Sequence, residues 1–178
     1  MKQSSLILFF FLVLLPLCAE NFYSVSSGSW FDSATWNQSG NIPGANDNVY
    51  IGSGHSVELV GASSVYVNSL VITGLDLPSA LVGPYNMDCV IYITENLDML
   101  SSPGSASLIP GDYGTLRVEL GHDLLLDGQC LYQAQRTTFT ALEDPITRRA
   151  QLNVIGSPQI NTIFDTSETA VMIEVSSS

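Results

Sequence analysis

Positive charge is the scarcest feature of this 178-residue sequence, which holds 5 lysine and arginine residues against 17 acidic ones. Lys2 is the only lysine, and the other cations are Arg117, Arg136, Arg148 and Arg149. A chain with a formal net charge of −12 repels phosphate backbones and anionic lipid surfaces. The composition therefore excludes nucleic-acid binding and argues against docking on anionic membranes.

Motifs of catalysis and cofactor binding are also missing from the sequence. It has no H-E-x-x-H, no paired-cysteine or histidine-triplet spacing, no G-x-S-x-G, no phosphate-binding loop and no dinucleotide fingerprint. The only two histidines, His55 and His122, each follow a glycine and are expected in turns. We predict no zinc site and no cofactor, and an enzyme is the less favoured interpretation.

The one long apolar run lies at the N-terminus. Residues 6–17 read LILFFFLVLLPL, after Lys2 and before Cys18 and Ala19. This run is too short for a membrane helix and is typical of a secretory signal peptide. We predict a signal peptide over residues 1–19 and a single domain over residues 20–178, which is secreted or held at the cell surface without a membrane span. An acylated Cys18 is disfavoured because Leu17 is bulky.

Two cysteines remain after cleavage, Cys89 and Cys130. In an exported protein they would form one disulfide across a loop of about 40 residues. Two buried free thiols are the alternative, and the sequence leaves both open.

Short β-branched runs separated by Gly, Ser, Asn and Pro dominate the rest of the chain. They are Asn48–Ile51, Ser56–Val60, Ser64–Val67, Ser69–Thr73, Val90–Thr94, Leu97–Leu100, Leu116–Leu120, Leu124–Leu126, Gln151–Ile155, Ile160–Phe164 and Val171–Val175. No window of 12 residues keeps helical apolar spacing, and the one candidate helix, Gln133–Glu143, has a threonine-rich centre that disfavours it. The domain is predicted to be all β.

Three segments share one form, in which an apolar strand end, a polar break and a second apolar strand follow each other. They are Ile93–Leu100, Leu120–Leu126 and the stretch around Gly156–Ile160, with breaks spaced by about 27 and 36 residues. Such spacings are close to one coil of a solenoid with inserted loops. We predict a short, right-handed parallel β-helix with an N-terminal capping segment, and a β-sandwich is the alternative.

Residues 29–74 carry the most specific pattern. It consists of W-x5-W from Trp30 to Trp36, P-x3-D-x-V-x-I over 43–51, G-H-x-V-x-L over 54–59 and N-S-L-x-I-x-G over 68–74. This pattern resembles the N-terminal region of secreted bacterial parallel β-helix surface proteins. It is also similar to the eight-glycine domain of cell-surface hyaluronidase-like and fibrocystin-like proteins. The resemblance implies an extracellular β-helix and no particular activity.

The same residues have a structural interpretation as a cap. Trp30 and Trp36 are large enough to close the open end of a stack of coils. Pro43 sets a turn, and Asp47 is placed to accept backbone N–H bonds in the bend before the first strand.

Acidic residues supply the candidate catalytic and metal sites. Asp98 in the first repeat is expected to stack on Asp123 or Asp127 in the second, with His122 beside them, as a catalytic set for polysaccharides. Asp47, Asp123 and Asp127 are calcium candidates, although neither segment follows a known calcium-loop pattern. Only Arg117 lies in this region to neutralise a substrate acid, which weakens the interpretation as a lyase.

We therefore expect a non-catalytic exported or cell-surface module with a structural, adhesive or glycan-contacting role. The alternative is a carbohydrate-active enzyme, a polysaccharide hydrolase or lyase, or the flanking module of one. The partner would be a polysaccharide or cell-surface glycan, stacked on the exposed tyrosines Tyr50, Tyr66, Tyr85, Tyr92, Tyr113 and Tyr132. The strand over Val171–Val175 is expected to expose an open coil, through which the chain self-associates unless the natural chain continues beyond it.

Overall fold

The computed structural model describes residues 19–140, 150–165 and 171–176, and it is built from short strands. The described residues form three sheets and one 3-10 helix, η1 (Ser33–Thr35). The seven-stranded sheet contains β1 (Asn21–Tyr23), β3 (Asn48–Ile51), β6 (Ser69–Gly74), β9 (Leu97–Ser101), β12 (Leu124–Asp127), β15 (Ala150–Ile155) and β18 (Val171–Ser176).

The other two sheets complete the set of strands. The six-stranded sheet contains β2 (Gly28–Ser29), β4 (Ser56–Glu58), β7 (Ser79–Val82), β10 (Ala106–Ile109), β13 (Cys130–Tyr132) and β16 (Gln159–Ile160). The five-stranded sheet contains β5 (Ser64–Val67), β8 (Cys89–Ile93), β11 (Leu116–Leu120), β14 (Arg136–Phe139) and β17 (Ile163–Asp165).

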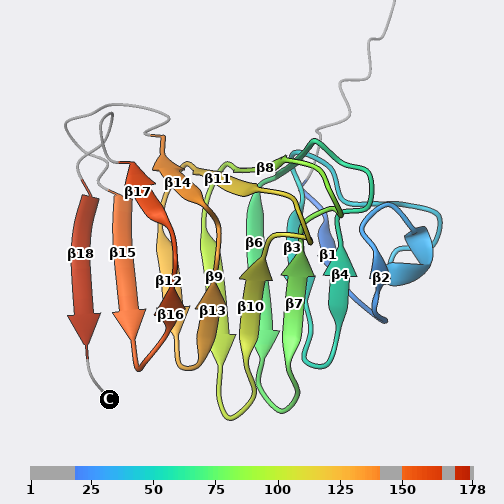
Figure 1. The fold of residues 1–178 in the computed structure, drawn as a ribbon. Coiled ribbons are helices and arrows are strands. Elements are labelled where there is room, and N and C mark those ends of the chain that lie inside the picture. The colour runs from blue at the N-terminus through green and yellow to red at the C-terminus, as the bar shows by residue number, and fades with distance from the viewer. Residues whose placement is uncertain (1–18, 141–149, 166–170, 177–178) are drawn as a thin grey trace, which may run out of the picture.

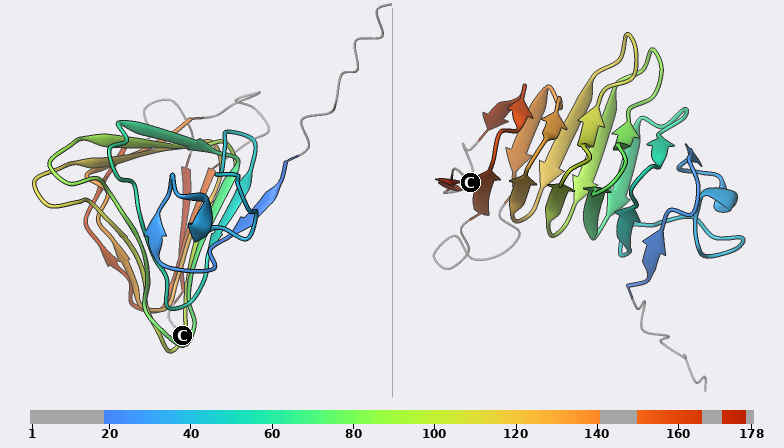
Figure 2. Two further views of the ribbon diagram at one scale, coloured as in Figure 1. Left: turned by 90° about the vertical axis from the view of Figure 1, so that its right-hand side faces the viewer. Right: turned by 90° about the horizontal axis from the view of Figure 1, so that it is seen from below.

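The chain visits the three sheets in turn, so three consecutive strands make one coil. From β3 onward each strand pairs in parallel with the strand three places later in the sequence. The coils lie side by side along one axis, and a view along that axis shows three walls around the core (Figures 1 and 2). The predicted all-β parallel β-helix is confirmed, and the β-sandwich alternative is wrong.

Strand register confirms the first spacing read from the sequence. Leu70 pairs with Leu97, and Leu97 pairs with Leu124, so two successive coils have the same length as the interval between the first two polar breaks. Leu124 in turn pairs with Leu152, so paired leucines follow each other from coil to coil. All four side chains point inward and are buried, because alternate residues of a strand face opposite sides of a sheet. The repeated leucines are therefore the core of the solenoid.

The third proposed repeat belongs to a different corner of the coil. Gly156–Ile160 connects the seven-stranded sheet to the six-stranded sheet, whereas the breaks at 94–96 and 121–123 connect the five-stranded sheet to the seven-stranded sheet. The true counterpart of Asp123 is Gln151, one position before the partner of Leu124. The longer of the two predicted spacings therefore runs between two different corners of the coil. These corners resemble each other only in their polar composition.

Most of the predicted strands are present, and the candidate helix is not. Arg136–Phe139, within the proposed helix Gln133–Glu143, is strand β14, and residues 141–143 lie outside the described part. Its threonines favour the extended backbone that pairing with β11 provides. The predicted strand Ile160–Phe164 is divided between β16 and β17 by a corner.

Candidate functional site

The two tryptophans lie buried at the N-terminal end of the stack. Trp30 and Trp36 are 1% and 2% exposed, and their rings meet edge to face with centroids 5.2 Å apart. The indole N–H of Trp36 donates to the Trp30 carbonyl at 2.8 Å. Phe22 packs edge-on against Trp36. The segment with β2 and η1 lies across the end of the coils (Figure 2), which is the position that a cap requires.

Asp47 holds the bend before β3 together, as the sequence predicts. Its two carboxylate oxygens accept the backbone N–H of Glu20 at 3.0 Å and of Gly44 at 2.8 Å. Pro43, which immediately precedes Gly44, is buried at this bend. The carboxylate of Asp47 therefore has a structural role, with both oxygens engaged by the backbone.

The calcium candidates do not come together. Asp123 precedes β12 and Asp127 ends it, so about 13 Å of extended chain separates them. Asp123 also accepts the backbone N–H of Gln151 at 2.8 Å. In the described part of the chain no three His, Cys, Asp or Glu side chains are grouped as they would be around a metal ion.

The proposed carboxylates are not register partners, although Asp98 and Asp123 lie near each other. Asp98 on β9 lies opposite Leu125 of the next coil, while Asp127 lies opposite Leu100. Asp123 precedes β12, and its backbone N–H is bonded to the side chain of Asn96. Partial burial, and then the nearby negative charge of Asp123, raise the pKa of Asp98.

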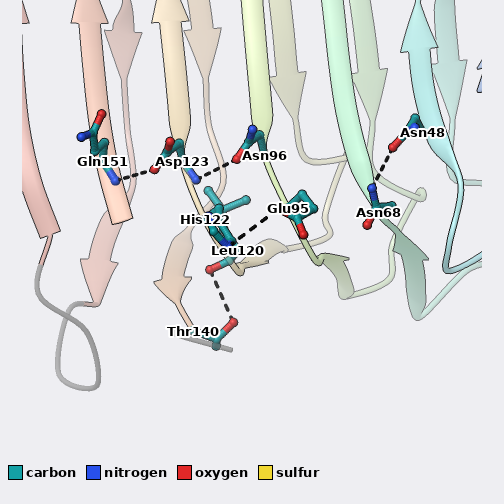
Figure 3. A network of polar contacts seen from close by, with 9 residues as sticks. All are labelled: Asn48, Asn68, Glu95, Asn96, Leu120, His122, Asp123, Thr140 and Gln151. Carbon is teal, nitrogen blue, oxygen red and sulfur yellow. Dashed lines mark hydrogen bonds and ion pairs between the residues drawn. The ribbon is translucent and has the colours of Figure 1, made fainter. Parts of the chain in front are cut away.

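Polar side chains form a ladder at the corner between the five-stranded and seven-stranded sheets (Figure 3). The amide of Asn68 donates to the Asn48 side chain at 2.8 Å. The Asn96 side chain accepts the N–H of Asp123 at 3.2 Å, and Asp123 in turn accepts the N–H of Gln151. These bonds tie successive coils together where the strands are interrupted, so this polar corner stabilises the fold.

His122 meets a different acid from the one expected. Its Nε2 lies 3.7 Å from a carboxylate oxygen of Glu95 on the preceding coil, at the polar corner (Figure 3). His55 is in a turn, as predicted, where its Nδ1 lies 2.8 Å from the Ser24 hydroxyl. The two histidines are on different coils and do not form one site.

Cys89 and Cys130 are free thiols. Cys89 begins β8 in the five-stranded sheet, and Cys130 begins β13 in the six-stranded sheet, and each is almost completely buried. Burial raises the pKa of the Cys89 thiol to about 11 and also raises that of Cys130. The structure therefore agrees with the free-thiol alternative and not with the disulfide.

Six of the seven tyrosines form three surface pairs. Tyr23 stacks on Tyr50, Tyr66 stacks on Tyr92, and Tyr85 meets Tyr113 edge to face. Tyr132, for which the sequence predicts an exposed ring, is fully buried and shares a hydrogen bond of 2.6 Å with Thr137. It cannot stack on a sugar.

The pair Tyr66–Tyr92 differs from the other two pairs in its surroundings. The two rings are 4.5 Å apart and almost parallel at 4°, so each covers one face of the other. A hollow of about 230 Å³ borders Tyr66 on the side of Trp30 and Pro43. A second hollow, of about 150 Å³, borders Tyr92 and Glu119. The stacked pair therefore stands between two hollows, with Tyr66 at one and Tyr92 at the other.

The second hollow has both apolar and polar residues in its lining. Glu119 lies beside Tyr92 on the next strand, and Ile93, Thr94 and Thr140 complete the lining. An aromatic ring beside a carboxylate and hydroxyls offers both stacking and hydrogen bonds to a sugar. This arrangement suits binding of a polyhydroxylated ligand.

Two arginines share the same outer face. Arg117 on β11 and Arg136 on β14 are register partners and are both exposed. They are the only lysine or arginine residues within the described ranges. We name this outer surface of the five-stranded sheet the tyrosine face, made of Tyr66, Tyr92, Arg117, Glu119 and Arg136.

The residues of the tyrosine face can be recognised as neighbours only when the register of the coils is known. Tyr66 pairs with Tyr92, and Tyr92 pairs with Glu119, so each step along the face is one coil of chain. The sequence predicts the tyrosines as glycan contacts, but it does not indicate Glu119 or the pairing of Arg117 with Arg136. Without the register, these residues are scattered along the chain.

No protein-family model, curated protein or solved structure matches this chain. The resemblance to the eight-glycine domain and to bacterial surface β-helices therefore stays a prediction. The predicted signal peptide lies almost wholly outside the described residues. Among the residues that the structure describes, no helix is both long enough and apolar enough to cross a membrane.

Proposed function

We propose that this chain is a non-catalytic, exported β-helix module that binds a polysaccharide on its tyrosine face. One observation carries the proposal: the stacked pair Tyr66–Tyr92 stands between two hollows on the outer side of a parallel sheet. Ligand rings stacked on the two free faces would lie about 12 to 14 Å apart, given usual stacking distances. An extended sugar chain can occupy both hollows, whereas one small sugar cannot.

A rigid framework supports this use of the surface. The tyrosines, Arg117 and Glu119 project from strands whose other side is buried in the core. Binding to such a surface costs little conformational entropy, because the backbone is already ordered by pairing on both sides. The acidic composition keeps the rest of the molecule soluble. A cell-surface or extracellular setting, which the N-terminal apolar run predicts, provides polysaccharide partners.

The proposal is tested by native gel electrophoresis of residues 20–178 through gels containing single polysaccharides. The panel contains three neutral polymers (xylan, β-glucan and galactan) and three acidic ones (polygalacturonate, alginate and hyaluronan). At least one polymer should retard the protein, and Tyr92→Ala should weaken the apparent affinity about tenfold, because one stacking face is lost.

Tyr23→Ala is the matched control. Tyr23 is also an exposed tyrosine stacked on another, but it lies on the seven-stranded sheet. This variant should be retarded like the unsubstituted protein. Equal weakening by the two substitutions, or no retardation by any of the six polymers, would contradict the proposal.

A carbohydrate-active enzyme is the second candidate, and the raised pKa of Asp98 is the observation that favours it. A glycoside hydrolase commonly uses two nearby carboxyl groups, and Asp123 lies near enough to Asp98 for its negative charge to contribute to the raised pKa of Asp98. These residues lie at the seven-stranded sheet, away from the tyrosine face. Incubation with the same panel should release no reducing ends or unsaturated products. Turnover that is abolished by Asp98→Asn or Asp123→Asn would favour the enzyme.

A further inference from the structure

We infer that the polysaccharide carries uronic acid carboxylates, and that Arg117 and Arg136 bind them on the tyrosine face. The inference rests on the proposed function and adds the chemical class of the ligand. The two guanidinium groups belong to adjacent strands and to paired positions, so their Cα atoms are about 4.8 Å apart. Both point outward, on the same side of the sheet as Tyr92 and Glu119.

Arg117 is the unusual member of the pair. It is exposed, and no acidic side chain of the described residues forms an ion pair with it. The chain holds 17 acidic residues, so an arginine without an ionic partner is unexpected on general grounds. Its planar guanidinium remains available to bind a carboxylate through two parallel hydrogen bonds.

The surroundings favour a polymer that can place carboxylates directly on the two arginines. Arg117 and Arg136 are the only lysine or arginine residues in the described ranges, and the formal net charge of the whole chain is −12. The acidic side chains repel a polyanion over most of the surface, so within the described ranges attraction is confined to the neighbourhood of these two arginines. Screening limits the reach of each charge to about 8 Å at physiological salt. A polymer with one carboxylate on a sugar can place that group on the arginines and stack its rings on Tyr66 and Tyr92.

The test compares each acidic polymer with its own neutral derivative. Polygalacturonate, alginate and hyaluronan are carboxyl-reduced, which converts the uronic acids to neutral sugars and leaves the backbone otherwise unchanged. Residues 20–178 should bind at least one native polymer about tenfold more tightly than its reduced form. This preference should shrink as sodium chloride is raised, because the ionic contribution is screened.

Substitutions of Arg117 then test whether its positive charge binds the carboxylates of the polymer. Arg117→Gln should weaken binding to the native polymer about tenfold and leave binding to the reduced polymer unchanged. Arg117→Lys should recover part of the loss, since it restores the charge without the planar fork. Ser107→Asp is the control, because it lowers the net charge by the same one unit on the outer side of the six-stranded sheet. Circular dichroism and thermal midpoints confirm that each variant is folded.

The outcomes separate the two proposals. Equal binding of native and reduced polymers, or equal losses from Arg117→Gln and Ser107→Asp, overturns the uronic acid inference. Binding to neutral polymers alone, still lost in Tyr92→Ala, overturns it too and leaves the proposed function standing. Failure of every polymer to bind overturns both.

Discussion

Trp36 closes the N-terminal end of the core, and its removal tests the cap. Its ring is 2% exposed and its indole N–H is bonded to the Trp30 carbonyl. We predict that Trp36→Ala lowers the free energy of unfolding by about 3–5 kcal/mol, as for other buried aromatic residues. Urea denaturation monitored by circular dichroism measures this change. Phe31→Ala is the comparison, because Phe31 is 44% exposed and should cost far less. A denaturation midpoint that Trp36→Ala leaves in place would disprove the cap.

The thiols of Cys89 and Cys130 should be present but unreactive. Burial holds the pKa of Cys89 at about 11, well above the pH of an Ellman titration, so the neutral thiol is protected both by its charge state and by packing. We predict almost no reaction in native residues 20–178 and two thiols per chain after denaturation without reductant. Denatured protein that shows no thiol until reductant is added would mean that the cysteines are bridged.

Single residues in the cap can be predicted from the sequence because their chemistry is local. The tryptophan spacing, Pro43 and the nearby Asp47 specify a bend without knowledge of distant strands. The partner of His122 cannot be predicted in this way. Glu95 reaches His122 because the chain returns to the same corner one coil later. Sequence proximity suggests Asp123 and Asp127 instead, and β12 carries Asp127 away from His122.

Strands are predicted best where apolar and polar residues alternate clearly. The sequence does not predict β7, β10 and β13, and all three belong to the six-stranded sheet. Their inward positions include the small residues Ser79, Ala106 and Cys130, which weaken the apolar signal. Each of these three strands is extended because the strands of the coils before and after it pair with it. Tertiary pairing therefore outweighs local propensity.

The coil is the structural unit, and removal of a whole unit should be tolerated. Excision of residues 97–123 joins Asn96 to Leu124, which occupies the same register position as Leu97. Stability in such a stack is a sum over coils and their interfaces. We therefore predict that the shortened protein keeps a β-sheet circular dichroism spectrum and unfolds cooperatively at a lower temperature.

Excision of residues 97–109 is the control for this prediction. It removes β9 and β10 but leaves β11, so the walls that follow are out of phase with the coils before them. This variant should not fold. A whole-coil deletion that is as disordered as the partial one would contradict the modular description of the solenoid.

The two ends of the molecule are unequal, and this predicts self-association of the recombinant chain 20–178. The outermost strands at both ends have one edge that no described strand pairs with, but the segment with β2 and η1 lies across the N-terminal end, and no described segment does the same at β16, β17 and β18 (Figure 2). Unpaired edges of parallel strands invite the addition of another chain. We predict association that grows with concentration in sedimentation velocity, and its suppression by Ile173→Lys, at the register partner of Leu152. A strictly monomeric protein at high micromolar concentration would refute this.

At the scale of the whole molecule, the fold class can be predicted from the sequence and the binding surface cannot. Short runs, turn residues and the first spacing between polar breaks are properties of the sequence itself. The tyrosine face is a property of the stack, since it joins residues from β5, β8, β11 and β14 that meet only when each coil is in register. Tyr132 has the same residue type as Tyr92 but faces the core, and only the orientation of its strand decides this.

Hydroxyl-radical footprinting of the tyrosines shows directly whether a polysaccharide binds the tyrosine face. The oxidation rate of each tyrosine in residues 20–178 is measured by mass spectrometry, with and without the polymer of the panel that retards the protein most. We expect bound polymer to slow oxidation of Tyr66 and Tyr92, while the equally stacked pair Tyr23 and Tyr50 oxidises at an unchanged rate. Protection of Tyr23 and Tyr50 without protection of Tyr66 and Tyr92 would place the polysaccharide on another wall and rule out binding at the tyrosine face.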